Sequence, residues 1–150
     1  MLTKPRIHHV PAGEGTCIAW SGEMRVKVGA AQSGDEITVI ENLKIPAGAG
    51  PGLHIHEKEN ELYYVLDGEF EFVCGDDRVC GGPGTFVFAP RGLPHRFKNI
   101  GSAPGRMLVS FTPGGIEGFF TELSAQTALN PQILGEIAGR YGITLVAPPE

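Results

Sequence analysis

Two segments of the chain decide its fold: GAGPGLHIHEKENELYYVLDG at residues 48–68 and GTFVFAPRGLPHRFKN at residues 84–99. Short runs of β-branched and aromatic residues alternate in them with glycine, proline and aspartate, which is typical of strands joined by tight turns. His54 and His56 are two residues apart on a predicted strand, so both side chains point to one face with Cα atoms about 6.6 Å apart. That spacing lets two imidazoles reach the same ion.

Two more side chains can complete a metal site. Glu61 follows a short polar loop and opens the next apolar run, so a hairpin would bring its carboxylate beside the histidine pair. His95 opens a further strand-like run, behind a loop stiffened by Pro90 and Pro94. Each residue taken alone fits an ordinary solvated or hydrogen-bonded side chain. Together, three imidazoles and one carboxylate favour one divalent ion, either Fe, Mn, Ni, Co, Cu or Zn. The predicted ligands are His54, His56, Glu61 and His95.

These segments resemble the two motifs of the cupin superfamily at ten positions. The matching residues are Gly48, His54, His56, Glu61 and Gly68 in the first motif, and Gly84, Pro90, Gly92, His95 and Asn99 in the second. The resemblance implies an all-β fold, the cupin double-stranded β-helix or jelly-roll barrel, with the same four residues as metal ligands. It does not select a reaction, because this barrel supports many different activities.

Length and composition suit one domain over residues 1–150, with a barrel at about 7–111 and a helical tail at about 115–142. A net charge of −5 argues against nucleic-acid binding, and the scattered basic residues argue against a membrane surface. Residues 1–10 contain no apolar run, so we expect no signal peptide and a cytoplasmic location.

The three cysteines are expected to be free thiols. They are odd in number and lack a C-x-x-C spacing. A four-residue turn at 75–78 would pair Cys74 with Val79, which would place Cys74 and Cys80 on opposite faces of the sheet.

The remaining pattern predicts many short strands followed by two helices. Strands are expected at residues 7–10, 16–20, 24–28, 37–45, 52–56, 62–66, 69–74, 78–80, 85–88, 95–100 and 107–111, with a tight turn at Asp67-Gly68. A first helix is expected at 115–123. Asn130 is a good N-cap for a second helix, whose apolar stripe ends at Tyr141 before Gly142. This tail is similar to that of small bacterial quercetin dioxygenase-like cupins.

Strand alternation indicates which side chains face the interior. Phe72 lies on an apolar strand face, and Phe97 lies on a strand face with a predicted metal ligand. Tyr63 follows Glu61 on the same face of its strand. All three side chains are therefore candidates for a substrate pocket. Tyr63 equally fits a core position. Glu41 falls among apolar residues of the run 37–45, where it either faces the cavity or is turned outward by a β-bulge, which we slightly favour.

Three functions share this site. The first is a dioxygenase, an oxidoreductase, that acts on a small enolisable or aromatic compound with Glu61 as the catalytic base. The second is a metal-dependent isomerase, lyase or decarboxylase, and the third is a protein that binds a small ligand without turnover. The apolar strands and Trp20, together with the family resemblance, also predict a homodimer.

Overall fold

The computed structural model describes residues 6–20 and 22–147. Residues 1–5, which belong to the segment expected to lack a leader, and residues 148–150 at the end of the predicted domain lie outside this description. One sheet contains β1 (Thr16–Ile18), β2 (Met24–Val28), β3 (Thr38–Ile45), β10 (Gly105–Thr112), β5 (Asn60–Asp67) and β8 (Phe86–Ala89), in that order. The second contains β11 (Ile143–Leu145), β4 (His54–His56), β9 (His95–Asn99), β6 (Phe70–Cys74) and β7 (Asp77–Gly81).

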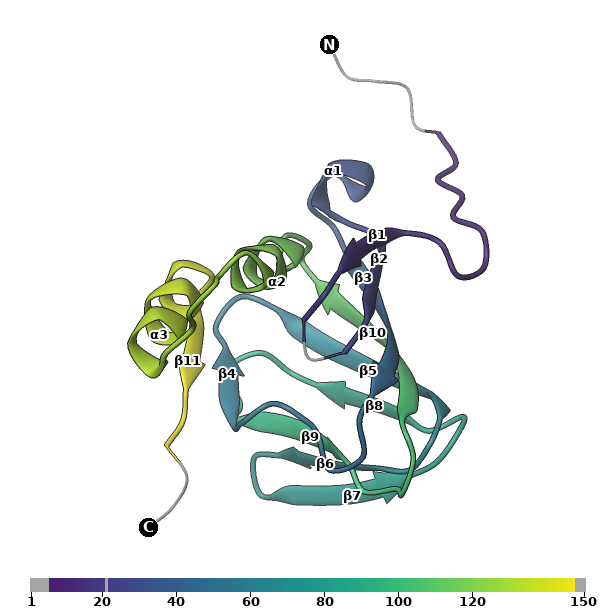
Figure 1. Cartoon of the computed structure of the whole chain (residues 1–150), viewed down its shortest axis with the longest axis vertical. Coiled ribbons are helices and arrows are strands. Elements are labelled where there is room, and N and C mark those ends of the chain that lie inside the picture. The colour runs from purple at the N-terminus through teal and green to yellow at the C-terminus, as the bar shows by residue number, and fades with distance from the viewer. Residues whose placement is uncertain (1–5, 21, 148–150) are drawn as a thin grey trace.

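The two sheets face each other and enclose the core, as Figure 1 shows. Their alternating side chains produce this arrangement: in β10, Met107, Val109 and Phe111 are buried while the residues between them are more exposed. Phe70 and Phe72 of β6 fill the space from the opposite sheet. The predicted all-β jelly-roll fold is confirmed, and Gly68 takes the positive φ of 92° that its tight turn requires.

The structure corrects several local predictions. Residues 7–10 form no strand, and a short helix, α1 (Ala30–Ser33), precedes β3. The β6–β7 turn is tighter than expected, because Cys74 pairs with Asp77 and not with Val79. Cys80 then lies opposite Glu71, so Cys74 and Cys80 still occupy different faces, and all three cysteines are free.

Strand β3 shows why Glu41 does not face the cavity. Its inward residues are Thr38, Ile40 and Asn42, so Glu41 lies on the outer face. There its carboxylate approaches Lys27 at 4.0 Å and Arg106 at 3.7 Å. A register shift lies between Asn42 and Ile45, after Glu41, and returns Ile45 to the interior. The expected bulge is therefore present, but Glu41 is already outward without it.

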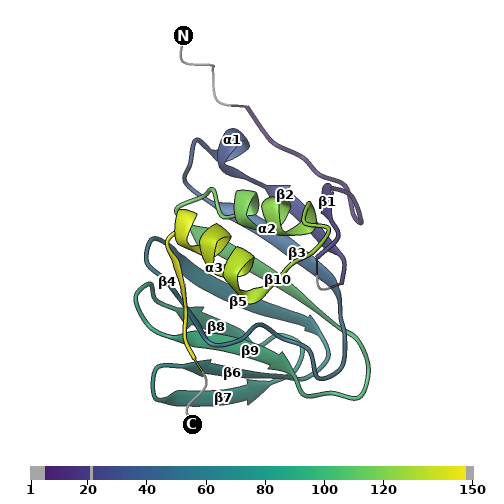
Figure 2. The same ribbon diagram turned by 60° about the vertical axis from the view of Figure 1, so that its left-hand side comes forward.

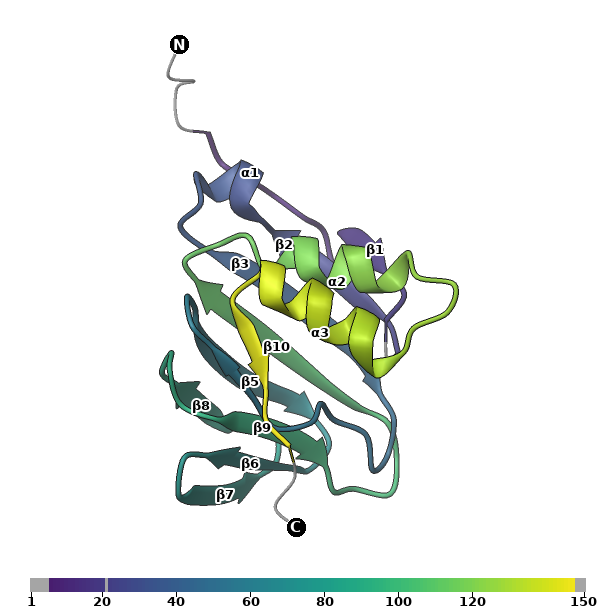
Figure 3. The ribbon, with the colours of Figure 1, turned by 90° about the vertical axis from the view of Figure 1, so that its left-hand side faces the viewer.

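The tail contains α2 (Glu117–Ser124) and α3 (Pro131–Arg140), which lie together on one side of the barrel (Figure 2). Asn130 caps α3 as predicted, since its side-chain oxygen accepts a hydrogen bond from the Ile133 amide at 2.9 Å. The chain then turns at Gly142 and forms β11, the yellow strand that follows α3 in Figure 3, and β11 pairs with β4 (Figure 1). None of the helices in residues 6–20 and 22–147 has the length and apolar character needed to span a membrane.

Glu117 joins the tail to the barrel. Its carboxylate accepts hydrogen bonds from the Thr38 hydroxyl, from the Ala30 amide at 2.7 Å and from the Gly115 amide at 3.1 Å. Burial alone would raise the pKa of this carboxyl, but these hydrogen bonds outweigh it and lower the pKa.

We predict that Glu117→Gln lowers the free energy of unfolding at pH 7 by about 1–2 kcal/mol, the lower part of the range for charge-assisted bonds because the group is partly exposed. The carboxylate contributes fully above its unfolded pKa, and the contribution disappears as pH falls through the lowered folded pKa. Urea unfolding from pH 7 to pH 3 checks this, with the exposed Glu36→Gln as the control. A stability difference that stays constant with pH would contradict the prediction.

Candidate metal centre

Three strands bring the four predicted ligands together inside the barrel. His54 and His56 lie on β4, His95 lies on the neighbouring strand β9 directly opposite His54, and Glu61 enters from β5 of the other sheet. One ligand atom from each residue lies within 4.8 Å of the other three, and the side chains are buried. The predicted convergence of these residues is thus present in the structure.

Hydrogen bonds orient the imidazoles. The Nδ1 atom of His54 lies 2.7 Å from the Gly52 carbonyl oxygen, and that of His95 lies 2.9 Å from the Leu93 carbonyl oxygen. A carbonyl only accepts, so each Nδ1 carries a proton, and each Nε2 is the atom left to bind a metal ion or a second proton. Such outer contacts are typical of metal-ligating histidines.

The inner sides of the rings face a carboxylate. The Oε2 atom of Glu61 lies 2.7 Å from His95 Nε2 and 3.2 Å from His56 Nε2. Imidazole nitrogens and a carboxylate oxygen directed at one point need a positive charge among them, which ring protons or a divalent cation can supply. The donor types and their convergence within 4.8 Å fit a divalent metal ion.

Glu59 is a buried residue of this site that the sequence analysis missed. Its Oε2 atom lies 3.5 Å from His56 Nδ1, on the side of the ring away from Glu61. His56 therefore faces a carboxylate where His54 and His95 face carbonyl groups. In the sequence, only the i, i+3 spacing between His56 and Glu59 indicates this contact. Within a loop, that spacing does not determine whether two side chains meet.

We predict that Glu59→Leu lowers metal affinity about 10–100-fold, the usual cost of losing an outer partner of a ligating histidine. Glu59→Gln keeps an acceptor for the Nδ1–H group and should recover most of the affinity. Competition titrations with a chromogenic chelator measure both variants. Equal affinity in the wild type and Glu59→Leu would show that Glu59 does not orient His56.

The charges in the cluster shift its pKa values in opposite directions. Burial lowers the pKa of His54 to about 4. Burial would also lower the pKa of His56, but the adjacent carboxylates of Glu59 and Glu61 outweigh it and raise that pKa to about 9. Burial alone would raise the pKa of Glu61, yet hydrogen bonds from His56 and His95 hold it well below its usual value. Glu61 is therefore ionised at neutral pH.

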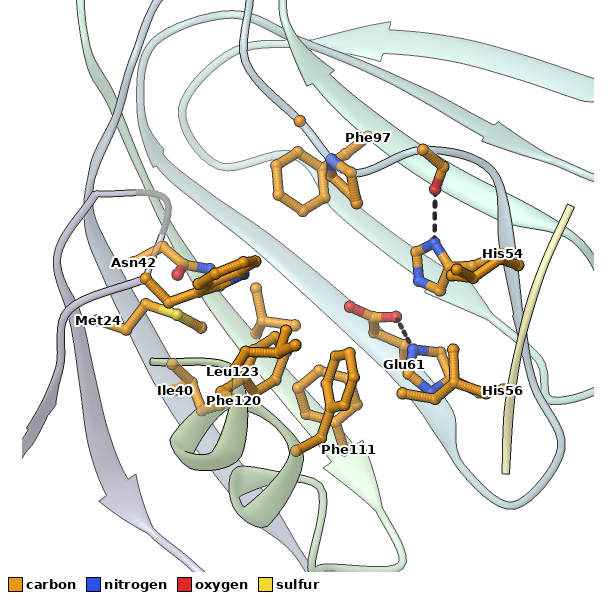
Figure 4. A pocket seen from close by; sticks show the side chains of 18 of the residues that line it. Met24, Ile40, Asn42, His54, His56, Glu61, Phe97, Phe111, Phe120 and Leu123 are labelled. Atoms are coloured by element: carbon orange, nitrogen blue, oxygen red, sulfur yellow. Dashed lines mark hydrogen bonds and ion pairs between the residues drawn. The ribbon is translucent and has the colours of Figure 1, made fainter. Parts of the chain in front are cut away.

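The cluster opens into a cavity of about 450 Å³, shown in Figure 4. Its wall is formed mostly by aromatic and aliphatic side chains from both sheets and from the tail. Among them are Phe97, Phe111, Phe119, Phe120, Leu123 and Leu134. Among the described residues that line the cavity, no side chain is Lys or Arg. The size lies within the range of small-molecule sites.

The structure separates the candidate pocket residues. Phe97 lines the cavity, as predicted. Tyr63 and Phe72 lie in the core and not in the cavity wall, with their ring centres 5.2 Å apart. Burial raises the pKa of Tyr63 well above its usual value, and the nearby Glu61 carboxylate adds to this effect, so the phenol stays protonated. Tyr63 thus takes the core position that the sequence left open as an alternative.

A jelly-roll barrel with three histidines and a glutamate converging in its interior defines the metal-binding class of cupins. The chain belongs to the cupin family. Residues 42–111 match the family model described as Cupin domain. The chain is also 30% identical over 101 residues to an oxalate-binding protein of Thermotoga maritima, a match that covers 67% of this chain and 79% of that protein.

Two further comparisons are less similar in sequence. The chain is 25% identical over 112 residues to the quercetin 2,3-dioxygenase of Bacillus subtilis, covering 75% of this chain and 33% of that enzyme. A crystal structure of an RmlC-like cupin from Shewanella frigidimarina superposes with a TM-score of 0.62 at 17% identity, covering 75% of this chain and 96% of the other. This structural similarity supports the fold alone.

Proposed function

We propose that the protein is a metal-dependent dioxygenase acting on a mainly apolar compound that carries an ionisable enol or phenol oxygen. The observation that carries the proposal is the position of the His54, His56, Glu61 and His95 cluster at an aromatic-walled cavity. Such a wall accommodates a planar ring and keeps bulk water from an activated anion. The similarity to quercetin 2,3-dioxygenase is consistent with this class of substrate.

The same cavity argues against a small dianion such as oxalate, although one relative is an oxalate-binding protein. A buried dicarboxylate needs compensating positive charge, because removing charges from water without partners is costly. The described lining residues provide no Lys or Arg side chain for the end of the molecule away from the cluster. The cavity therefore supports a dioxygenase better than a decarboxylase acting on oxalate.

Glu61 is the proposed base. Its carboxylate faces the cavity beside His56 (Figure 4), and its Oε2 atom lies 2.7 Å from His95 Nε2. A substrate hydroxyl entering from the cavity would reach this oxygen and donate its proton to it. A bound divalent ion would supply Lewis acidity that favours the deprotonated substrate. Phe97 and Phe111 would hold the ring in place.

The test is an oxygen-electrode screen of metal-loaded protein with flavonols, diketones and hydroxylated aromatics, followed by mass analysis of products formed under labelled O₂. The proposal expects incorporation of label, with Glu61→Gln losing turnover even where metal is retained. Conversion of a substrate without O₂ uptake would instead support an isomerase, lyase or decarboxylase. Tight binding without conversion would support a ligand-binding protein.

We also infer a homodimer formed through the outer face of β5 and β8. Tyr64, Phe86 and Phe88 are exposed there, with Tyr64 opposite Phe86 in the strand register. Strand β8 ends its sheet, so its free edge can pair with the same strand of a second copy. Light scattering should give twice the chain mass of 16.0 kDa, and Phe88→Lys should give the monomer mass. A monomeric wild type at micromolar concentration would contradict the inference.

A further inference from the structure

One polar side chain stands apart from the metal cluster in the apolar cavity wall. Asn42 of β3 lines the cavity and shares the inward face of its strand with Thr38 and Ile40. Among the described lining residues outside the cluster, only Asn42 and Trp20 carry a side-chain atom that can form hydrogen bonds. The Asn42 amide alone of these both donates and accepts.

The immediate neighbours of Asn42 do not explain its presence. Its partners in the sheet are Met24 on β2 and Met107 on β10, and both side chains are buried and apolar. Within residues 6–20 and 22–147 the Asn42 side chain forms no hydrogen bond, and it is partly exposed at the cavity. Asparagine is disfavoured within strands, so an apolar side chain would suit this inward position of β3 at least as well.

Asn42 lies across the cavity from the metal cluster. Figure 4 shows Asn42 and Met24 on one side and His54, His56 and Glu61 on the other, with aromatic side chains such as Phe111 in the wall between them. A molecule with an oxygen at the cluster would therefore reach Asn42 only with its opposite end. The wall in between offers it apolar contacts.

We propose that Asn42 is a specificity-determining residue that binds a hydroxyl or carbonyl group at the far end of the substrate. The ligand is then an aromatic compound with a polar group at each end: an ionisable oxygen at the cluster and a neutral hydrogen-bonding group at Asn42. This inference rests on the proposed aromatic ligand of the site. It adds the requirement that the ligand carry a second polar group at the end that contacts Asn42.

Two probes test the proposal by calorimetric titration of Zn²⁺-loaded protein, which binds without oxidising them. One is phenylcatechol, with its phenyl ring para to a catechol hydroxyl, and the other is its analogue with an additional hydroxyl at the far end of the phenyl ring. The wild type should bind the analogue about 5-fold more tightly, the value of one net hydrogen bond of about 1 kcal/mol. Asn42→Leu should abolish this preference and bind both probes alike.

Matched variants separate recognition from folding. Met24→Leu changes the neighbouring apolar wall residue and should keep the preference. Asn42→Val, which suits a strand, should lose the preference as Asn42→Leu does. The melting temperature of Asn42→Leu should equal or exceed that of the wild type, because no internal hydrogen bond is lost. Each of these results would support the role of Asn42 in binding.

Three outcomes would overturn the proposal: a wild type that does not distinguish the probes, a preference that survives in both Asn42 variants, or a large fall in melting temperature in both. Binding with the expected preference but without O₂ uptake by any substrate would reject only the dioxygenase. Failure of both probes to bind the wild type would reject the aromatic ligand as well as the role of Asn42. The experiments therefore distinguish a failure of the proposed dioxygenase function from a failure of the proposed role of Asn42.

Discussion

Replacing His95 with alanine is expected to reduce bound metal from about one ion per chain to a trace after dialysis, while the protein remains folded. Losing an outer partner of a ligand already costs about 10–100-fold in affinity, so losing one of the four donors should cost at least 100-fold. His95 is buried at the start of β9, and its side chain contacts Glu61 at 2.7 Å. After the substitution His56 Nε2 still lies 3.2 Å from the Glu61 carboxylate, so the buried charge keeps a partner and the fold should persist.

Elemental analysis of the dialysed variant, with a melting curve beside it, measures this effect. His8→Ala is the matched control, because His8 is an exposed histidine outside the cluster. The control should retain the wild-type metal content. A folded His95→Ala protein with unchanged stoichiometry would show that His95 is not a ligand.

Truncation after Thr127 is expected to have the largest effect on stability. It removes α3 and β11, and with them the buried side chains of Ile137 and Ile143. Two large buried side chains at roughly 2–5 kcal/mol each make about 4–10 kcal/mol. At about 2–4 °C per kcal/mol for a chain of this size, the melting temperature should fall by about 8 °C or more, or the protein should fail to fold.

The truncation should also weaken the metal site. Strand β11 pairs with β4, where Ile143 lies opposite His56 and Leu145 lies opposite His54. Without it, β4 becomes the edge of its sheet and the cavity loses Leu134, Ile143 and Leu145 from its wall. Differential scanning calorimetry with and without Zn²⁺ measures both effects. An unchanged melting curve would mean that the tail does not support the barrel.

The ligand set could be predicted from sequence because each element that carries it has a strong local signal. The two-residue period of a strand fixes the common face of His54 and His56, and Asn130 followed by Pro131 marks the start of α3. Glu61 follows a short polar loop, and His95 follows a loop that contains Pro90, Gly92 and Pro94. The family motifs agree with these local signals, so the convergence of the four side chains was predictable.

Other features depend on the register between strands and on contacts in space, which one sequence does not reveal. The inward positions of β3 depend on its pairing with β10. The sequence alone therefore does not show that Glu41 faces outward and that Asn42 faces the cavity. Strand β11 contains only Ile143–Leu145 and exists because β4 offers it a free edge. Glu59 reaches His56 through a loop whose path no periodic pattern describes.

The central claim is that His54, His56, Glu61 and His95 hold one divalent metal ion. X-ray absorption spectroscopy of the wild-type protein loaded with a single equivalent of Zn²⁺ tests it most directly, because the spectrum reports the donor atoms around the ion. The account predicts one ion per chain with three imidazole nitrogens, at least one carboxylate oxygen and no sulfur. A spectrum with cysteine sulfur, with fewer than two imidazoles, or of an ion surrounded only by water would contradict it.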